Sequence, residues 1–596
     1  MKPRKKKGNN KKRVKFGGES LILKKAEQFL SAGKLQDAIE QFKKIPDGSE
    51  NYGRACKGQG AALLRIRKLK QALPILQSAH IALPKDPEIL VDGADVARLM
   101  GNLEVAEDTY REARKLGAQG YQLLFGEASI FLERKLWLEA VRLWEALNQS
   151  YPENPFVLHN LGRSWHELGE TDKAVAFMKR SFELGGEMIT LSTLALLAPH
   201  AGDIGHQEVK RLRVELHNRL AEEEGIRPGI KALNKSGRTL NIGYVSAFFH
   251  RRNWMKPVWA LLNHHDREKF NVHLFADGPL DEIASAGGYI SGVRDKLFDT
   301  RALSNRELAE LISELKIDVL VDLNSYSAIK RLGLWTSKPA PVTVGWFNLY
   351  ATSGMQGIEW LIGDDVVIRA EEERFYTEKI ARLNQSYLTF QVGYDTPDIE
   401  FPHGGEPFTY GCLGSGYKIT PEVRAAWIRI LKETRGTRLL VRNRILGNDL
   451  HKEWFLKFFA EEGIDPERLM LLGPSEHREF LKTYGKIDIA LDTFPYNGGT
   501  TTMEALWQGV PVVCFSGDRW VGRTSATLMH SAGLDEFIGA DLNEYVDIAV
   551  RLKADEGRKR LRKIRTQMRE HLENSEVCDG AGLAKDFERI ISEIII

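Results

Sequence analysis

A repeat of 34 residues constrains the first half of this chain more than any other feature does. Small residues recur at that spacing five times without a gap, at Ala38, Ala72, Ala106, Ala140 and Ala174. Large apolar residues follow each alanine at helical spacing, and these are Phe42, Leu76, Tyr110, Trp144 and Met178. The period predicts stacked pairs of antiparallel helices, because a small residue lets two helices approach closely.

Glycines occupy the expected turns between the paired helices. Gly33, Gly101 and Gly169 each lie five residues before one of the repeated alanines. The whole pattern resembles the tetratricopeptide repeat, so we expect an α-solenoid over residues 19–220. A degenerate sixth unit from about Gly186 to Leu220 is expected to cap it. Solenoids of this kind bind extended peptides or partner proteins, which makes a non-catalytic scaffold one hypothesis for the whole chain.

Basic residues are concentrated at the start of the chain, within residues 1–18. Such a run is typical of a disordered, solvated tail, and a nuclear address or a contact with an anionic surface are the alternatives. The net charge of the chain is only +3, which gives no reason to expect nucleic acid as a partner. No apolar stretch follows the basic run and no run of about 18 apolar residues occurs, so neither a signal peptide nor a membrane span is expected.

Cysteine usage favours a reducing compartment. The four cysteines, Cys56, Cys412, Cys514 and Cys578, show neither CxxC pairing nor metal-ligand spacing. A disulfide framework and a zinc site are therefore not expected, and the chain is predicted to be a soluble cytoplasmic protein.

After residue 225 the pattern changes to short apolar strands that alternate with helices. Such alternation predicts parallel βαβ units, and two consecutive sets predict two Rossmann-like lobes that face each other across a cleft. The strands are expected at 240–246, 270–276, 317–323 and 342–347 in the first lobe, and at 408–413, 438–442, 469–473, 487–492 and 510–515 in the second.

The segment from Asp488 to Val513 carries the strongest chemical signal. A strand ends near Asp492, and a loop with Gly498 and Gly499 then enters a helix through Thr500, Thr501 and Thr502. The unpaired amides of a helix start suit a diphosphate, the glycines allow close approach of the backbone, and the hydroxyls add donors. Glu504 follows on the same helix and could accept ribose hydroxyls. The alternative is an ordinary strand-to-helix turn with a threonine cap.

That segment is similar to the donor-site motif of the protein O-GlcNAc transferases, especially their bacterial relatives. The resemblance extends from about Leu240 to the end of the chain, after a repeat arm as in that family. The other matching motifs begin at Asn241, Asp266, Asp322, Lys338, Thr352, Tyr417 and Glu476, and Arg523 matches beyond the donor helix.

The resemblance implies a fold and a set of site residues. It implies a GT-B region with an N-terminal catalytic lobe at 240–400 and a C-terminal, nucleotide-sugar-binding lobe at 401–596, joined to the solenoid by a linker at 221–239. Lys418 matches the lysine that binds the pyrophosphate, and His477 matches a histidine near the nucleoside. Thr500, Thr501 and Thr502, which follow Gly498 and Gly499, match the diphosphate contacts, and Glu504 takes the place of the ribose-binding carboxylate.

Departures from the family pattern lie near the expected sugar and acceptor sites. The family commonly has a histidine where this chain has Arg252, and His250 lies two positions earlier. His250 is the candidate general base, with a loop histidine that only packs as the alternative. The segments 348–354 and 413–415 also differ, so the donor sugar stays open.

These features together predict an inverting, metal-independent glycosyltransferase that modifies serine or threonine of proteins bound through the repeat arm. The first expectation for the donor is UDP-GlcNAc, and a different nucleotide sugar used on flagellin or another surface protein is the alternative. The chain contains no Asp-x-Asp motif, so neither a metal nor any other cofactor is expected. We expect Lys418 and helix amides to neutralise the leaving diphosphate instead.

Overall fold

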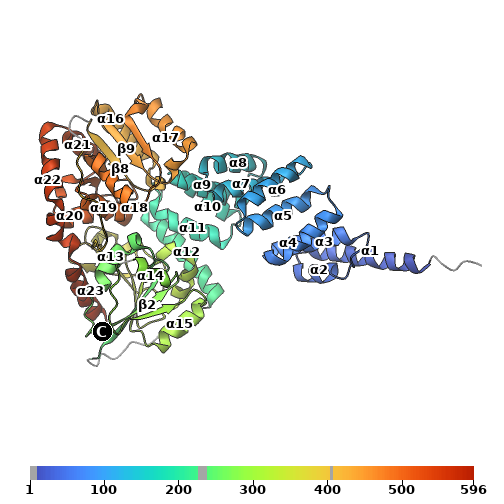
Figure 1. Cartoon of the computed structure of the whole chain (residues 1–596). Coiled ribbons are helices and arrows are strands. Elements are labelled where there is room, and N and C mark those ends of the chain that lie inside the picture. Colours follow the sequence, from blue (N-terminus) through green and yellow to red (C-terminus); the bar gives the residue numbers. More distant parts are fainter. Residues whose placement is uncertain (1–9, 226–237, 287, 403–406, 596) are drawn as a thin grey trace, which may run out of the picture. The chain divides into compact units, whose positions relative to one another are not determined.

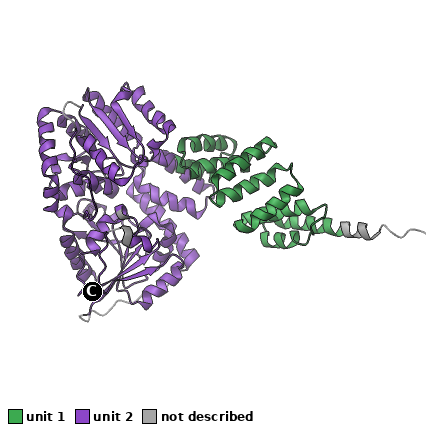
Figure 2. Cartoon of the chain, viewed as in Figure 1, with its two compact units in different colours: residues 1–164 green, residues 165–596 purple. Residues whose placement is uncertain are grey.

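The computed structural model describes residues 10–225, 238–286, 288–402 and 407–595. The first nine residues of the predicted tail and most of the predicted linker lie outside the described residues. The chain divides into two compact units, Met1–Ser164 and Trp165–Ile596 (Figure 2). None of the described helices is long and apolar enough to cross a membrane.

The first unit is a series of helical hairpins, as the 34-residue period predicts. Its helices are α1 (Asn10–Ser31), α2 (Leu35–Phe42), α3 (Tyr52–Arg65), α4 (Leu69–Ala82), α5 (Pro87–Leu99), α6 (Leu103–Lys115), α7 (Tyr121–Glu133) and α8 (Trp137–Ser150). The first helix begins at Asn10, within the segment predicted as a tail. The repeated alanines are fully buried where paired helices meet. The turn glycines Gly33 and Gly101 have positive φ, which a residue with a side chain rarely adopts.

The end of the repeat array belongs to the second unit. Helix α9 (Pro155–Glu167) spans the division, and α10 (Thr171–Glu183), α11 (Met188–Leu197) and α12 (His206–Glu224) follow it. The last two form the predicted sixth hairpin. Leu194 and Leu212 of this hairpin share a hydrophobic core with Leu308 and Leu320 of the first α/β lobe. We name residues 165–224 the cap segment.

The first lobe contains a seven-stranded parallel sheet in the order β3-β2-β1-β4-β5-β6-β7. Figure 1 labels β2 of this sheet and the helices α13, α14 and α15 of the same lobe. The strands are β1 (Leu240–Ser246), β2 (Phe270–Ala276), β3 (Lys296–Asp299), β4 (Val319–Asp322), β5 (Val342–Gly345), β6 (Trp360–Asp364) and β7 (Lys379–Leu383); the helices are α13 (Arg252–Leu262), α14 (Asp281–Ala286) and α15 (Asn305–Glu314). All four predicted strands are present. The sequence reasoning missed β3, β6 and β7.

The second lobe contains a six-stranded parallel sheet in the order β10-β9-β8-β11-β12-β13. Its strands are β8 (Thr409–Cys412), β9 (Arg438–Arg442), β10 (Leu469–Leu472), β11 (Ile489–Leu491), β12 (Val512–Phe515) and β13 (Ile538–Gly539); its helices are α16 (Pro421–Glu433), α17 (Asp449–Glu461), α18 (His477–Lys482), α19 (Thr500–Trp507), α20 (Thr524–Ser531), α21 (Leu542–Leu552) and α22 (Asp555–Glu573). Thr420 caps α16 by accepting a hydrogen bond from the Val423 amide, as predicted. Two Rossmann-like lobes of this kind form the predicted GT-B architecture.

The last helix, α23 (Gly580–Ile594), leaves the second lobe and packs on the first. Glu588 accepts hydrogen bonds from His265 Nδ1 and from the Asp266 amide, both at 2.8 Å. Asp586 likewise accepts hydrogen bonds from the amide and the side chain of Asn384. The sequence reasoning placed all of residues 401–596 in the second lobe. That assignment does not hold for α23, because its apolar face is buried against α13 and β7.

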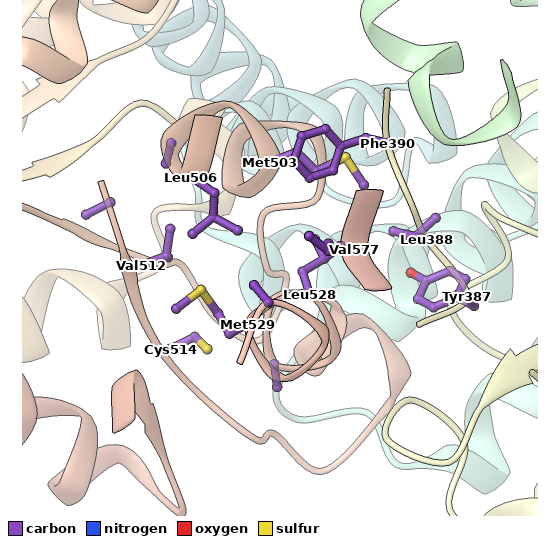
Figure 3. Close-up of a cluster of buried hydrophobic side chains, with 14 of the residues drawn as sticks. Tyr387, Leu388, Phe390, Met503, Leu506, Val512, Cys514, Leu528, Met529 and Val577 are labelled. Atoms are coloured by element: carbon purple, nitrogen blue, oxygen red, sulfur yellow. The ribbon is translucent and has the colours of Figure 1, made fainter. Parts of the chain in front are cut away.

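A hydrophobic cluster supports helix α19, which begins at the glycine-rich loop. Figure 3 shows Met503 and Leu506 of this helix among side chains of β12 and α20, namely Val512, Cys514, Leu528 and Met529. Tyr387, Leu388 and Phe390, from the connection between the lobes, complete the cluster together with Val577. Helix α19 therefore rests on a core built from the second lobe and the connection between the lobes.

The buried ion pair between Arg523 and Glu372 joins the two lobes. Arg523 Nη1 lies 2.9 Å from a carboxylate oxygen of Glu372, and both side chains are buried. We expect Arg523→Met to destabilise the second unit by about 3–5 kcal/mol, because it leaves a buried carboxylate without its partner.

Thermal and denaturant unfolding of the full chain would measure this effect. The double variant Arg523→Met/Glu372→Gln is expected to recover much of the loss. Arg560→Gln, which removes an exposed pair with Glu536, is the control and should cost less than about 1 kcal/mol. Equal losses in Arg523→Met and Arg560→Gln would contradict this account of the interlobe pair.

Candidate functional site

A pocket in the second lobe gathers several of the predicted site residues. Lys418, Gly498, Thr501 and Thr502 line it together with Asp492. They come from the carboxyl ends of β8 and β11, which are adjacent in the sheet, and from the start of α19. Ligands of parallel sheets bind at this edge. The glycine-rich loop and the lysine, separated by about eighty residues in sequence, therefore meet as predicted.

Lys418 ends a short 3₁₀ turn, η5 (Gly416–Lys418). Its Nζ donates to the Asn497 carbonyl at 2.7 Å and lies 3.6 Å from the centre of the Tyr496 ring. Among the described residues, no carboxylate lies within ion-pair distance of this ammonium group. Burial lowers the pKa of Lys418 to about 8, and the charge of Asp492 partly opposes that decrease. Binding of an anion beside Lys418 would stabilise the protonated form of its amine.

Asp492 follows β11 and lies at the bottom of the same pocket. One carboxylate oxygen accepts the Gly498 amide at 2.8 Å, and the other has no hydrogen-bond partner among the described residues. Burial raises the pKa of Asp492 to about 6, although Ser525, backbone amides and the charge of Lys418 oppose the increase. The sequence reasoning treated this residue only as a strand end.

The start of α19 presents amides and hydroxyls to the pocket. Gly499 precedes the helix and supplies no side-chain cap. A Cβ on Gly498 would lie 2.5 Å from Thr502 Oγ1 and 2.8 Å from Thr501 Oγ1, so only glycine fits there. Thr502 shares a hydrogen bond with Ser525, and Thr500 donates to the Asn253 carbonyl of the first lobe. This arrangement fits a phosphate group at the helix start.

Glu504 binds two basic side chains at the boundary between the lobes. The same carboxylate oxygen lies 2.7 Å from Lys256 Nζ, on α13, and 2.7 Å from His477 Nε2, on α18. Burial opposes ionisation of Glu504, but the charge of Lys256 and the hydrogen bonds from His477 and Lys256 outweigh burial and lower its pKa. The ring of Tyr394 lies beside both Lys256 and His477.

These contacts bring Glu504 and His477 together as the resemblance implies, and they add Lys256. The first lobe supplies this lysine, and nothing in the local sequence pattern of α13 identifies it as a site residue. In this structure the carboxylate assigned to ribose hydroxyls is engaged by side chains. A nucleoside that reaches Glu504 would therefore share it with Lys256 or displace that side chain.

His250 lies in the first lobe, in the loop after β1. Its Nδ1 is buried without a hydrogen-bond partner among the described residues and faces Gly278, where a Cβ would approach it to 2.5 Å. The edge of the His250 ring that carries Nδ1 therefore packs against Gly278. The described contacts of His250 do not include Lys418 or the glycine-rich loop. The role of His250 as a general base therefore stays a prediction.

Clusters of three or more His, Cys, Asp or Glu side chains that could hold a metal ion do not occur among the described residues. All four cysteines are free, and three of them are buried.

Comparison with known proteins identifies relatives of the α/β region. The sequence profile of Glycosyl transferase family 41 matches residues 228–403 and 404–587. A protein of Solanum lycopersicum, named probable UDP-N-acetylglucosamine–peptide N-acetylglucosaminyltransferase SPINDLY, is 30% identical over 363 residues, which cover 59% of this chain and 38% of that protein. The Caenorhabditis elegans UDP-N-acetylglucosamine–peptide N-acetylglucosaminyltransferase is 22% identical over 438 residues, which cover 54% and 38%.

Among solved structures, a mutant of the Thermobaculum terrenum O-GlcNAc transferase is similar over 86% of this chain and 97% of that one, with a TM-score of 0.74 and 26% identity. The similarity includes helical repeats as well as both lobes, since it covers more of the chain than the α/β region alone. The chain spans less than half of the length of the curated relatives that it matches.

The raised pKa of Asp492 predicts how the stability of the second unit depends on pH. Asp492 binds a proton more tightly in the folded state than in the unfolded state. Its contribution to the free energy of unfolding therefore decreases as pH rises from about 4 to about 6, and stays reduced above that range. We expect Asp492→Asn to raise the unfolding temperature of the second unit at pH 7.5. The gain should shrink by roughly half at pH 5, because the wild-type carboxyl group is then mostly protonated. A gain that does not depend on pH would contradict the burial of a charged Asp492.

Proposed function

Because the chain belongs to glycosyl transferase family 41, we propose that it transfers a sugar from a nucleotide diphosphate donor to serine or threonine hydroxyls of a protein. The observation that carries this proposal is the ammonium group of Lys418, which is half-buried beside the start of α19 without a carboxylate partner among the described residues. A diphosphate would supply the missing negative charge, and the amides of Thr500–Thr502 would bind its oxygens.

The proposed reaction is a single displacement. The acceptor hydroxyl oxygen forms a bond to the anomeric carbon, the bond between that carbon and the diphosphate oxygen breaks, and the diphosphate leaves with the electron pair. Lys418 and the α19 amides stabilise the charge that develops on the leaving group, so the mechanism needs no metal ion. Attack opposite to the leaving group inverts the configuration at the anomeric carbon.

UDP-GlcNAc is the proposed donor. Its support is the activity that the relatives in Solanum lycopersicum and Caenorhabditis elegans are named for, and the pairing of Glu504 with His477 where a nucleoside is expected. The segments 348–354 and 413–415 depart from the family pattern, so another nucleotide sugar is the alternative. Incubation with a panel of nucleotide sugars, followed by mass measurement of an acceptor protein, distinguishes the two.

The acceptor hydroxyl must lose a proton, and His250 is the proposed base. It lies at the carboxyl edge of the first-lobe sheet, three residues from Asn253, which contacts Thr500 of the second lobe. Unchanged turnover in His250→Ala would instead favour a packing role for His250.

The repeat arm is proposed to hold the protein acceptor. A polypeptide bound along the hairpins of the first unit raises the effective concentration of its hydroxyl groups at the active site. A flagellin or another surface protein is one candidate client on family analogy alone. The alternative of a scaffold without catalysis predicts that neither UDP nor GDP binds, which calorimetry tests directly.

Lys418→Ala is expected to lower the rate of transfer at least about a hundredfold, because the charge of the leaving diphosphate is no longer balanced. Activity is measured with the donor that the panel identifies, and circular dichroism checks that the fold is retained. Lys418→Arg is the matched variant, since it keeps the charge. Transfer at the wild-type rate in Lys418→Ala would sink the assignment.

The pKa of Lys418 predicts how donor affinity depends on pH. The protonated amine binds the diphosphate, so UDP affinity should be nearly constant below pH 8 and fall by about tenfold per pH unit above it. Calorimetry between pH 6.5 and 9.5 measures this slope. In Lys418→Arg the slope should vanish over the same range, because the guanidinium group keeps its proton. The same slope in both proteins would assign the titration to another group.

Deletion of residues 19–150 tests the role of the arm and leaves the second unit complete. We expect glycosylation of a protein client to fall far more than hydrolysis of the donor. Equal losses in both assays would show that the arm only stabilises the enzyme. A client modified equally well by the shortened chain would refute a guiding role.

A further inference from the structure

The cap segment contacts the turn that carries Lys418. Gly169, in the turn between α9 and α10, has φ of +85°, and a Cβ there would lie 2.3 Å from the Ile419 carbonyl oxygen and 3.3 Å from that of Gly416. The backbone of the last complete repeat therefore touches η5 on both sides of the lysine. Glu170 continues this contact through a partly buried ion pair with Arg424 of α16.

A second contact reaches Lys418 from the other side, through Tyr496. His200 ends η1 (Ala198–His200), after α11, and its ring stacks on Tyr496 with 4.2 Å between centroids and 20° between planes. Lys418 Nζ lies over the same tyrosine ring at 3.6 Å. The imidazole is buried, and its Nδ1 has no hydrogen-bond partner among the described residues. Tyr350 of the first lobe also packs against Tyr496 and completes the aromatic group.

The charge state of His200 fits this arrangement. Burial lowers the pKa of His200 well below its usual value, and nearby positive charges, including that of Lys418, act in the same direction. A neutral ring on Tyr496 is compatible with the ammonium group of Lys418, whereas an imidazolium ion would repel it.

We propose that Gly169 and His200, both supplied by the end of the repeat array, are positioning residues that hold Lys418 in place for the diphosphate. Gly169 fixes the backbone of η5, and His200 fixes the ring on which the ammonium group lies. The cap segment is then part of the donor site as well as the end of the protein-binding arm. This inference rests on the proposed role of Lys418 in donor binding.

The first test compares two glycines in equivalent repeat turns. Gly101 has the same φ of +85° as Gly169, but a Cβ on Gly101 would meet no atom within 4 Å. Gly169→Ala and Gly101→Ala therefore share the backbone strain, and only Gly169→Ala pushes against η5. We expect Gly169→Ala to weaken UDP binding and transfer at least tenfold, while Gly101→Ala keeps both. Equal effects of the two substitutions would overturn the proposal.

The second test measures Lys418 without any donor. An amine-reactive acylating probe modifies the neutral amine, and mass spectrometry follows the rate at Lys418 as pH is varied. The midpoint in the wild type should lie at about 8. His200→Ala should raise this midpoint, because water then reaches the face of Tyr496 that His200 covers. His200→Phe should restore the wild-type midpoint, because a flat neutral ring again covers that face. His217→Ala, a buried histidine of α12 outside the aromatic group, is the control.

These two readouts separate the possible outcomes. An unchanged midpoint in both His200→Ala and Gly169→Ala, in folded proteins, would refute the positioning role. A shifted midpoint in a protein that binds no nucleotide would leave the positioning of Lys418 standing and refute the proposed function instead.

Discussion

The proposed donor site depends on one constraint, which is that the half-buried ammonium group of Lys418 has no carboxylate partner among the described residues. The Asn497 carbonyl and the Tyr496 ring hold Lys418, and neither group neutralises its charge. Asp492, at the bottom of the same pocket, is itself disfavoured as an anion by burial. The second lobe therefore places two ionisable groups, each disfavoured in its charged form by burial, beside the start of α19. A diphosphate would supply the negative charge that Lys418 lacks, which is the basis of the proposed stabilisation of the leaving group.

The cap segment connects that site to the rest of the second unit. Arg213 of α12 donates to the carbonyls of Leu349 and Thr352 in the first lobe, and Arg519 of the second lobe donates to the carbonyls of Ala201 and Ile204 in the cap segment. The same segment thus contacts both lobes near the aromatic group around Tyr496. Any movement of one lobe relative to the other must either carry the cap segment with one lobe or break these buried hydrogen bonds.

The sequence predicted the repeat fold and the strand–loop–helix that contains Gly498 and Gly499, because local residue patterns indicate both. The spacing of the buried alanines identifies the hairpins, and the run from Gly498 to Thr502 identifies the helix start. Lys256 and His200 could not be predicted in this way, since each reaches the site through tertiary packing from another element. The same reason explains α23, whose amphipathic pattern indicates a helix but not the lobe that it covers. Strands β6 and β7 were missed because the apolar run of β6 is short and that of β7 is interrupted by Arg382.

The most direct test of the central claim is a structure of the full chain bound to UDP. We predict that the diphosphate lies between Lys418 Nζ and the amides of Thr500–Thr502, with the nucleoside beside His477 and Glu504. A nucleotide bound at another place, or bound with its phosphates away from Lys418, would contradict the account.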